Sequence, residues 1–322
     1  MSKIHNIVSV SGDKDSTALL LLAMERGAEN LQAVFADTGH EHQQTYDYVR
    51  YLEQATGVPI RWVRADFSER IANKATYVRE KWLEKGVPAA DIDRALAVLD
   101  KGPTGNPFLD LCIWKGRFPS TKARFCSEEL KRNPIVEQVQ MPLLDAGHEV
   151  ISWQGVRADE SPARALLKES ECVGTWPDTG GELWNYRPIL KWTAEQCFDM
   201  HRRHGIKHNP LYEQGMGRVG CMPCIHARKD ELLEISKRFP DEVARVAEWE
   251  RIVSEASKRK SATFFAATDI GVTSNSEDTV RDANIFKFVE WSKTSRGGKQ
   301  YDLIRADQTD GFACSSIYGL CE

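Results

Sequence analysis

The first 65 residues alternate between strand and helix patterns, and this alternation strongly limits what the chain can fold into. β-rich apolar runs separate two stretches with helical periodicity, the second of which ends at Gly57. This order predicts a parallel sheet with right-handed crossovers, and hence an α/β fold. The strands are expected at residues 4–10, 31–36, 60–64 and, from a dense apolar run, 149–155, and the helices at 16–26 and 43–56.

The remaining chain predicts an insertion and a C-terminal region. Residues 68–119 form the insertion, which is helical at first, is broken by 102–107, and is expected to cap the mouth of the sheet. Further helices are expected at 68–85, 90–99, 193–204, 228–238 and 241–258. We therefore expect a nucleotide-binding domain at 1–225. A helical and irregular region at 226–322 follows, whose tail packs back on a cysteine site.

A short polar loop between the first strand and its helix has the composition of a phosphate site. Its backbone N–H groups can converge on an anion, and the N-terminus of the helix adds partial positive charge. Lys14, expected to lie exposed in the loop, supplies a full charge, and Asp15 could orient the lysine or cap the helix. The loop consists of Ser11, Gly12, Asp13, Lys14, Asp15 and Ser16, and it is not a Walker loop.

Two other segments should face this loop, because each follows a strand of the predicted sheet. Asp37, Thr38 and Gly39 come after the second strand. Arg157 follows the strand at 149–155, where its guanidinium can hold phosphate or sulfate in a bidentate fork, and Arg164 lies two helical turns further on. The alternative for Arg157 is a surface ion pair with Asp159 or Glu160.

We expect a role other than disulfide formation for the cysteines, because we expect a cytosolic protein and the cytosol keeps thiols reduced. Cys221 and Cys224 have the two-residue spacing of zinc or iron–sulfur ligands, and follow a glycine-containing loop. The same spacing occurs in redox disulfides, although no thioredoxin-like pattern surrounds it. Cys112, Cys172 and Cys197 are expected to be small buried hydrophobic residues.

Taken together, five motifs resemble the phosphoadenosine phosphosulfate (PAPS) reductase-like family of PP-loop ATP pyrophosphatases. Residues 11–16 resemble the SGGKDS signature, with Asp13 in place of the second glycine. The other motifs are Phe-Ala-Asp-Thr-Gly-His-Glu at 35–41, Arg-Phe-Cys-Ser-Glu-Glu-Leu-Lys at 124–131, Gly-Val-Arg-Ala-Asp-Glu-Ser at 155–161 and Arg-Val-Gly-Cys-Met-Pro-Cys at 218–224. The resemblance spans residues 5–225.

The resemblance implies an adenine nucleotide, ATP or PAPS, as ligand, with Lys14 and Arg157 in catalysis and Arg218 among the binding residues. It also implies a [4Fe–4S] cluster, with zinc as the alternative, on Cys126, Cys221 and Cys224, and Cys314 completes the set. This family uses a mobile C-terminal cysteine as nucleophile, so Cys321 is expected to be either that nucleophile or a ligand. A sulfur donor or thiol reductant would then be a partner.

Net charge and hydropathy limit which other classes of partner are expected. The net charge is −4, so contact with a nucleic acid would need a local basic patch, for which the histidines and arginines between His201 and His208 are the candidate. The longest apolar run, 18–24, is too short to cross a bilayer, and no signal peptide precedes it. We expect a cytoplasmic protein without a membrane partner.

Three functions remain open at this stage. The first is a PAPS-reductase-like enzyme that transfers or reduces sulfur. The second is an ATP pyrophosphatase that adenylates a nucleic acid for sulfur insertion. The third is a protein that only senses adenylate, for which Asp13 is the best indication.

Overall fold

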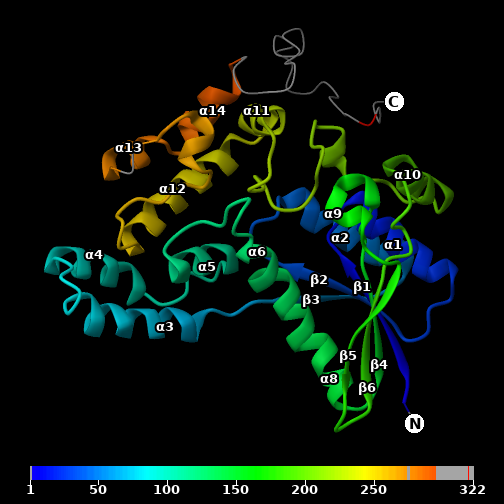
Figure 1. Cartoon of the computed structure of the whole chain (residues 1–322). Coiled ribbons are helices and arrows are strands. Elements are labelled where there is room, and N and C mark those ends of the chain that lie inside the picture. The colour runs from blue at the N-terminus through cyan, green and yellow to red at the C-terminus, as the bar shows by residue number, and fades with distance from the viewer. Residues whose placement is uncertain (1, 274–275, 295–317, 319–322) are drawn as a thin grey trace.

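Six strands form one twisted sheet in the order β3-β2-β1-β4-β6-β5 (Figure 1). The computed structural model of the chain describes residues 2–273, 276–294 and 318. The strands are β1 (Ile4–Val10), β2 (Leu31–Asp37), β3 (Ile60–Arg64), β4 (Glu149–Trp153), β5 (Ser170–Trp176) and β6 (Gly181–Tyr186). All neighbouring pairs are parallel except β5 and β6, which form an antiparallel hairpin at one edge. The predicted α/β class and its first four strands are therefore confirmed.

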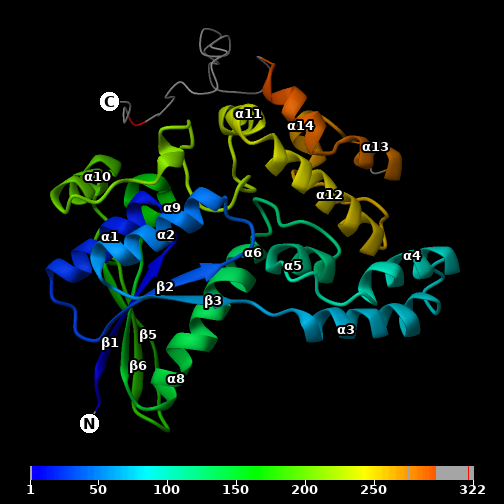
Figure 2. The same cartoon turned by 180° about the vertical axis from the view of Figure 1, so that it is seen from behind.

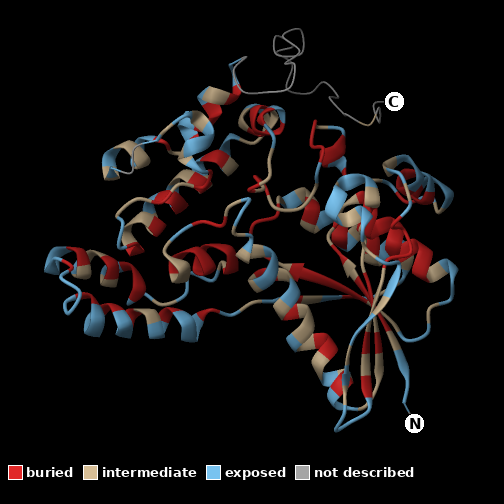
Figure 3. Cartoon of the chain, in the orientation of Figure 1, coloured by how far each residue is buried: buried red, intermediate tan, exposed pale blue. Residues whose placement is uncertain are grey.

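Helices cover both faces of the sheet. Successive strand residues point to opposite sides, and apolar side chains on both sides pack against helices. Val8 packs with α1 (Lys14–Glu25), α2 (Gln43–Thr56) and α10 (Ala194–Arg203). Its neighbour Ile7 packs on the other face against the helical rod that runs from α6 (Phe125–Ser127) through α7 (Asn133–Ile135) to α8 (Met141–Asp145). The central strands β1 and β2 are largely buried, whereas the edge strand β5 is mostly exposed (Figure 3).

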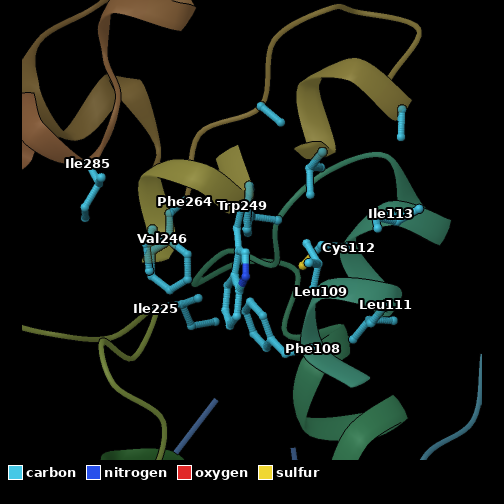
Figure 4. Packing of buried hydrophobic residues seen from close by; sticks show 14 of the residues in the cluster. Phe108, Leu109, Leu111, Cys112, Ile113, Ile225, Val246, Trp249, Phe264 and Ile285 are labelled. Carbon is cyan, nitrogen blue, oxygen red and sulfur yellow. The ribbon is translucent and has the colours of Figure 1, made fainter. Parts of the chain in front are cut away.

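The insertion and the C-terminal region share a second core beside the sheet (Figure 2). From the insertion come α3 (Ser68–Tyr77), α4 (Ala89–Leu99) and α5 (Pro107–Lys115), and from the C-terminal region α11 (Lys229–Arg238), α12 (Pro240–Ala256), α13 (Glu277–Asp282) and α14 (Ile285–Ser292). Phe108 of α5 stacks on Trp249 of α12 with ring centroids 5.5 Å apart, and Phe264 lies beside both (Figure 4). The insertion thus packs with the C-terminal helices as one helical body.

A buried carboxyl joins two parts of this body. Glu250 of α12 accepts hydrogen bonds from the backbone N–H of Phe264 (2.8 Å) and of Ile285 (2.9 Å). Burial raises the pKa of Glu250 to about 7, against the two donors, which lower it. The protonated form therefore stabilises the fold, and this contribution is present below about pH 4.5 and is lost as the pH rises through 7.

We expect Glu250→Gln to lower the free energy of unfolding by about 1–3 kcal/mol near pH 5, because an amide nitrogen cannot accept a hydrogen bond from either N–H. The wild type should also lose stability between pH 5 and pH 8, by up to about 3 kcal/mol from this group, and the variant should lose less. Urea unfolding at both pH values measures this. A variant as stable as the wild type near pH 5 contradicts the role assigned to Glu250.

Among the described residues, no helix is both long and apolar enough to cross a membrane.

Candidate functional site

The sheet places two loops side by side at the point where its winding direction changes. β1 lies between β2 and β4, so the loops that follow β1 and β4 leave the same end of the sheet on neighbouring strands. In open α/β sheets, ligands bind in the crevice at such a point. Residues 11–16 follow β1, and Arg157 comes four residues after the end of β4.

The phosphate loop owes its shape to a glycine and a capping aspartate. Gly12 has φ +75°, a conformation that favours glycine, and a Cβ there would lie 3.1 Å from Thr45 Cγ2. Asp13 is the N-cap of α1, and its carboxylate accepts a hydrogen bond from the backbone N–H of Ser16 at 2.7 Å. Ser11 donates its backbone N–H to Ser16 Oγ at 3.0 Å. One N–H of the helix N-terminus is therefore already bound by the protein's own carboxylate.

Lys14 is buried, and the expectation that it lies exposed in the loop is wrong. Only 5% of the residue is exposed, since α1 begins at Lys14, two residues earlier than predicted, and packs closely against α10. Its ammonium lies 3.1 Å from Asp15 Oδ2 and 5.2 Å from the ring centroid of Tyr318. Charges of Asp15 and Asp13 raise the pKa of Lys14 against the opposing effect of burial, so the amine stays charged.

Asp15 connects the two loops. Its carboxylate lies between Lys14 and Arg157, with 2.8 Å from Asp15 Oδ1 to Arg157 Nε. Arg157 also donates from Nη1 to Asp159 at 3.0 Å. All three side chains of the Lys14–Asp15–Arg157 group are 6% exposed. Of the two roles expected for Asp15, orientation of the lysine is the one observed, and the cap is Asp13.

α10 and the segment after it make hydrogen bonds to the backbone of the phosphate loop. His201 donates from Nε2 to the carbonyl oxygen of Lys14 at 3.0 Å, Tyr212 accepts from the backbone N–H of Lys14 at 3.0 Å, and Asn209 donates to the carbonyl of Gly12 at 3.1 Å. Burial lowers the pKa of His201 to about 4, so the ring is neutral at pH 7. Sequence reasoning placed His201 in a solvated patch; it is instead a buried support.

In the loop after β2, the side chains of Asp37 and Thr38 are hydrogen-bonded to groups of the protein itself. Thr38 is fully buried and donates to the Glu41 carboxylate at 2.8 Å. Asp37 accepts from the backbone N–H of Gly39 and from the hydroxyl of Tyr46, both at 2.9 Å. The loop also contacts the insertion, because the side chain of Asn106 donates to the carbonyl of Gly39 at 2.6 Å. Its polar groups are thus bonded within the loop, to α2 and to the start of α5.

Three arginines, from the segments at 124, 157 and 218, lie within electrostatic reach of Arg164. Burial lowers the pKa of Arg164, and the positive charges of Arg218, Arg124 and Arg157 lower it further, while Asp15 raises it. Arg157 and Arg164 each have a carboxylate partner. Arg124 and Arg218 are exposed, and no ion pair holds either within the described part of the chain. We call these four residues the arginine cluster; such a group fits a doubly charged phosphate or sulfate.

Sequence reasoning missed two members of this region. Arg124 was noticed only as part of a motif, and its nearness to Arg164 depends on the fold. His226 lies near the same cluster: burial lowers its pKa, and Arg218 and Arg124 lower it further. The sequence signal that could have identified Arg124 as a site residue was its position two residues before Cys126 in the Arg-Phe-Cys motif.

Three of the predicted cysteine ligands, Cys126, Cys221 and Cys224, act on the charge of one lysine, Lys131. Cys221 pairs by a β-bridge with Glu41, and its thiol donates a weak hydrogen bond to Glu41 Oε1 at 3.7 Å. The thiol also lies 3.6 Å from the hydroxyl of Thr38. The pKa of Lys131 is raised, first by Cys221 and then by Glu41, Cys224 and Cys126, so all three thiols lie within its electrostatic reach. Burial raises the pKa of Cys221 to about 12. These three cysteines are referred to as the thiol group.

The thiol group does not by itself make a metal site. Within the described ranges, no set of three or more His, Cys, Asp or Glu side chains is arranged to hold a metal ion. Cys314 and Cys321, the predicted fourth ligand and nucleophile, lie outside the described residues. Cys112 and Cys197 are buried as expected, but Cys172 is exposed, because β5 is an edge strand with little cover.

The predicted basic patch on α10 is neutralised by neighbouring acids. Arg202 pairs with Glu195 and Asp199, and Arg203 and His204 both pair with Glu25. His208 pairs with Glu213 in the same way. The patch predicted from spacing therefore offers little net charge to an anionic partner.

Comparison with known proteins agrees with this geometry. Residues 5–227 match the phosphoadenosine phosphosulfate reductase domain. A protein of Escherichia phage 186, described as an uncharacterized 37.8 kDa protein, is 52% identical over 98% of this chain and 96% of its own length. An adenosine 5'-phosphosulfate reductase of Allochromatium vinosum is 34% identical over 23% of this chain and 27% of its own.

A solved phosphoadenylyl-sulfate reductase from Candida auris, in a phosphate complex, covers 69% of this chain and 82% of its own at 16% identity, with a TM-score of 0.39. The match to the family covers the sheet, the phosphate loop, the arginine cluster and the thiol group. The chain therefore belongs to the phosphoadenosine phosphosulfate reductase domain family.

Proposed function

We propose that this protein is an enzyme that binds an adenine nucleotide at the phosphate loop and acts at the phosphate or sulfate end of that nucleotide. The observation that carries the proposal is the arginine cluster, which gathers beside the Lys14–Asp15–Arg157 group. Cys126, two residues from Arg124, brings the thiol group to the same place. An anion bound by the arginine cluster would lie near the thiols of the thiol group.

With PAPS, the reaction we favour is transfer of the sulfonate to a thiolate. The thiolate sulfur attacks the sulfate sulfur, the S–O bond to the phosphate breaks, and adenosine 3',5'-bisphosphate leaves with the electron pair. A thiol reductant then displaces sulfite and forms a disulfide, which supplies the two electrons. Lys14 and the arginine cluster would orient the nucleotide and stabilise the charge that builds up on the leaving oxygen. Cys321 stays the proposed attacking thiolate.

With ATP, the same groups would serve a different bond. An oxygen of an acceptor would attack the α-phosphorus, and pyrophosphate would leave with its electron pair onto the arginine cluster. The lysine of the SGGKDS-like loop favours this second candidate, since it already stands as a buried cation held by Asp15.

Two assays separate these reactions. The protein is incubated with ATP, and separately with PAPS and a dithiol, and pyrophosphate and sulfite are measured. Sulfite from PAPS supports the first reaction, and pyrophosphate from ATP in the presence of an acceptor supports the second. If both nucleotides bind and neither is consumed, the protein is an adenylate sensor and the proposal is wrong.

Asp13 limits nucleotide affinity in our account, because its carboxylate takes the N–H of Ser16 and adds negative charge to the loop. We expect Asp13→Gly to tighten binding of ATP or PAPS about tenfold, or by about 1.4 kcal/mol. Glycine at an N-cap costs only a few tenths of a kcal/mol. Asp13→Asn, which keeps a capping oxygen without the charge, is the control that separates the two effects. Calorimetric titration in which Asp13→Gly binds no more tightly than wild type contradicts this account.

The thiol group is proposed to hold a metal centre together with Cys314 or Cys321. When bound, a [4Fe–4S] cluster would supply a compact charge beside the arginine cluster; zinc would supply a structural tie. We expect protein purified without oxygen to contain about four iron atoms per chain, or about one zinc, by elemental analysis. Cys221→Ser should lose the metal, and Cys172→Ser, at an exposed cysteine of β5, should keep it. Folded wild-type protein free of both metals contradicts the site.

A further inference from the structure

A basic groove lies on the helical body, and no residue of the phosphate loop lines it. It lies between α3, the end of α5 and the segment that follows α12, with a volume of about 690 Å³. Its six basic side chains are Arg70, Lys74, Lys115, Arg117, Lys258 and Arg259. No acidic residue lines it among the described residues, although the whole chain carries a net charge of −4.

Most of the charge in this groove is available to a ligand. Arg70, Arg117, Lys258 and Arg259 are exposed, and the described part of the chain gives none of them an ion-pair partner. Lys115 pairs with Glu129 at 3.0 Å, and Lys74 donates to the carbonyl of Ile113 at 2.6 Å. The groove therefore differs from the α10 patch, where the arginines already have carboxylate partners.

Aromatic rings lie among these cations. Trp114 lines the groove, with Lys115 Nζ 3.7 Å and Arg70 Cζ 5.0 Å from its ring centroid. Tyr77 also lines it and is 44% exposed, with Lys85 Nζ 5.0 Å from its ring centroid. Cations that follow a backbone, together with exposed rings on which bases can stack, are the combination that binds single-stranded nucleic acids.

One side of the groove lies near the segment that carries Arg124 and Cys126. Lys115 Nζ and Arg117 Cζ lie 5.8 Å and 5.5 Å from the ring centroid of Phe125, which stands between Arg124 and Cys126. Phosphates bound at this side of the groove would therefore lie near Arg124 of the arginine cluster and Cys126 of the thiol group.

We propose that this groove binds a single-stranded nucleic acid and leads it toward the candidate site. The inference concerns binding, and it stands whether or not the nucleotide reaction proposed above is correct. It also names the acceptor class that the ATP reaction would require.

The test is fluorescence anisotropy with labelled 20-nucleotide single-stranded RNA and DNA, a duplex of the same length, and a polyglutamate competitor. The groove variant is Arg70→Glu/Arg117→Glu/Lys258→Glu. Its control is Arg50→Glu/Arg202→Glu/Arg203→Glu, which makes the same change of charge at exposed arginines outside the groove. Thermal melting verifies that both variants fold.

We expect wild type and control to bind at least one single strand more tightly than the duplex, and the groove variant to bind at least tenfold more weakly. The slope of log K against log salt should become shallower by about 2, because each phosphate contact contributes about 0.7 for a single strand. Lys14→Ala should bind the strand normally, which separates this result from nucleotide turnover.

Equal loss in the groove variant and the control, or no binding by wild type, overturns the proposal. Polyglutamate that competes as well as RNA of equal charge also overturns it, because the groove would then recognise an acidic polypeptide.

Discussion

Lys14→Ala is expected to lower kcat/KM for the nucleotide at least a hundredfold, which corresponds to about 2.7 kcal/mol of transition-state stabilisation. The variant removes the cation that stands against Asp15 at the start of α1. Asp15 keeps Arg157 as partner, so the buried carboxylate is not left without a countercharge and the fold should persist. Steady-state kinetics and thermal melting measure the two effects.

Lys287→Ala, at an exposed lysine on α14, is the matched control and should act as wild type. A folded Lys14→Ala protein with unchanged nucleotide affinity and turnover removes the phosphate-loop assignment.

Arg157→Lys is expected to lower turnover tenfold or more, although it keeps the charge. Arg157 uses Nε toward Asp15 and Nη1 toward Asp159 at the same time, and the planar fork lets one group do both. A lysine ammonium has no such geometry, so the orientation of Asp15 and of Lys14 should suffer. The comparison of kcat with KM shows whether binding or the chemical step is lost.

Arg94→Lys is the control, since Arg94 also makes several hydrogen bonds but lies in the helical body. It should lose stability and keep turnover. Normal turnover by Arg157→Lys would mean that Arg157 is only an ion-pair partner of Asp15 and Asp159.

Local sequence signals predicted the bounds of two elements of the sheet domain, α2 and β3. The bounds of α2 and β3 follow from periodicity and the αL glycine at Gly57, and they match the structure. The signals for these segments are local, because their caps and apolar faces are determined by residues close by in the sequence.

Two elements were missed because tertiary packing decides them. The rod at 125–145 contains Pro134 and Pro142, which normally break helices, and π-helical turns at 128–132 and 136–140 carry the chain past them. The hairpin of β5 and β6 has an edge strand that is mostly exposed, so it lacks the apolar pattern of a buried strand.

The site was predicted in its parts and not in its connections. The motifs gave Lys14, Arg157 and the thiol group, but the ion pair of Asp15 with Arg157 and the support of Lys14 by His201 join residues more than 140 positions apart. The basic groove, too, combines segments near 70, 115 and 258, which no local window can bring together.

The measurement that tests the central claim most directly is calorimetric titration of the wild-type protein with PAPS, ATP and adenosine. We predict that at least one of the two nucleotides binds at least a hundredfold more tightly than adenosine, because Lys14 and the arginine cluster recognise the phosphates or sulfate. Adenosine that binds as tightly as both nucleotides, or no binding of any of the three, would contradict the account.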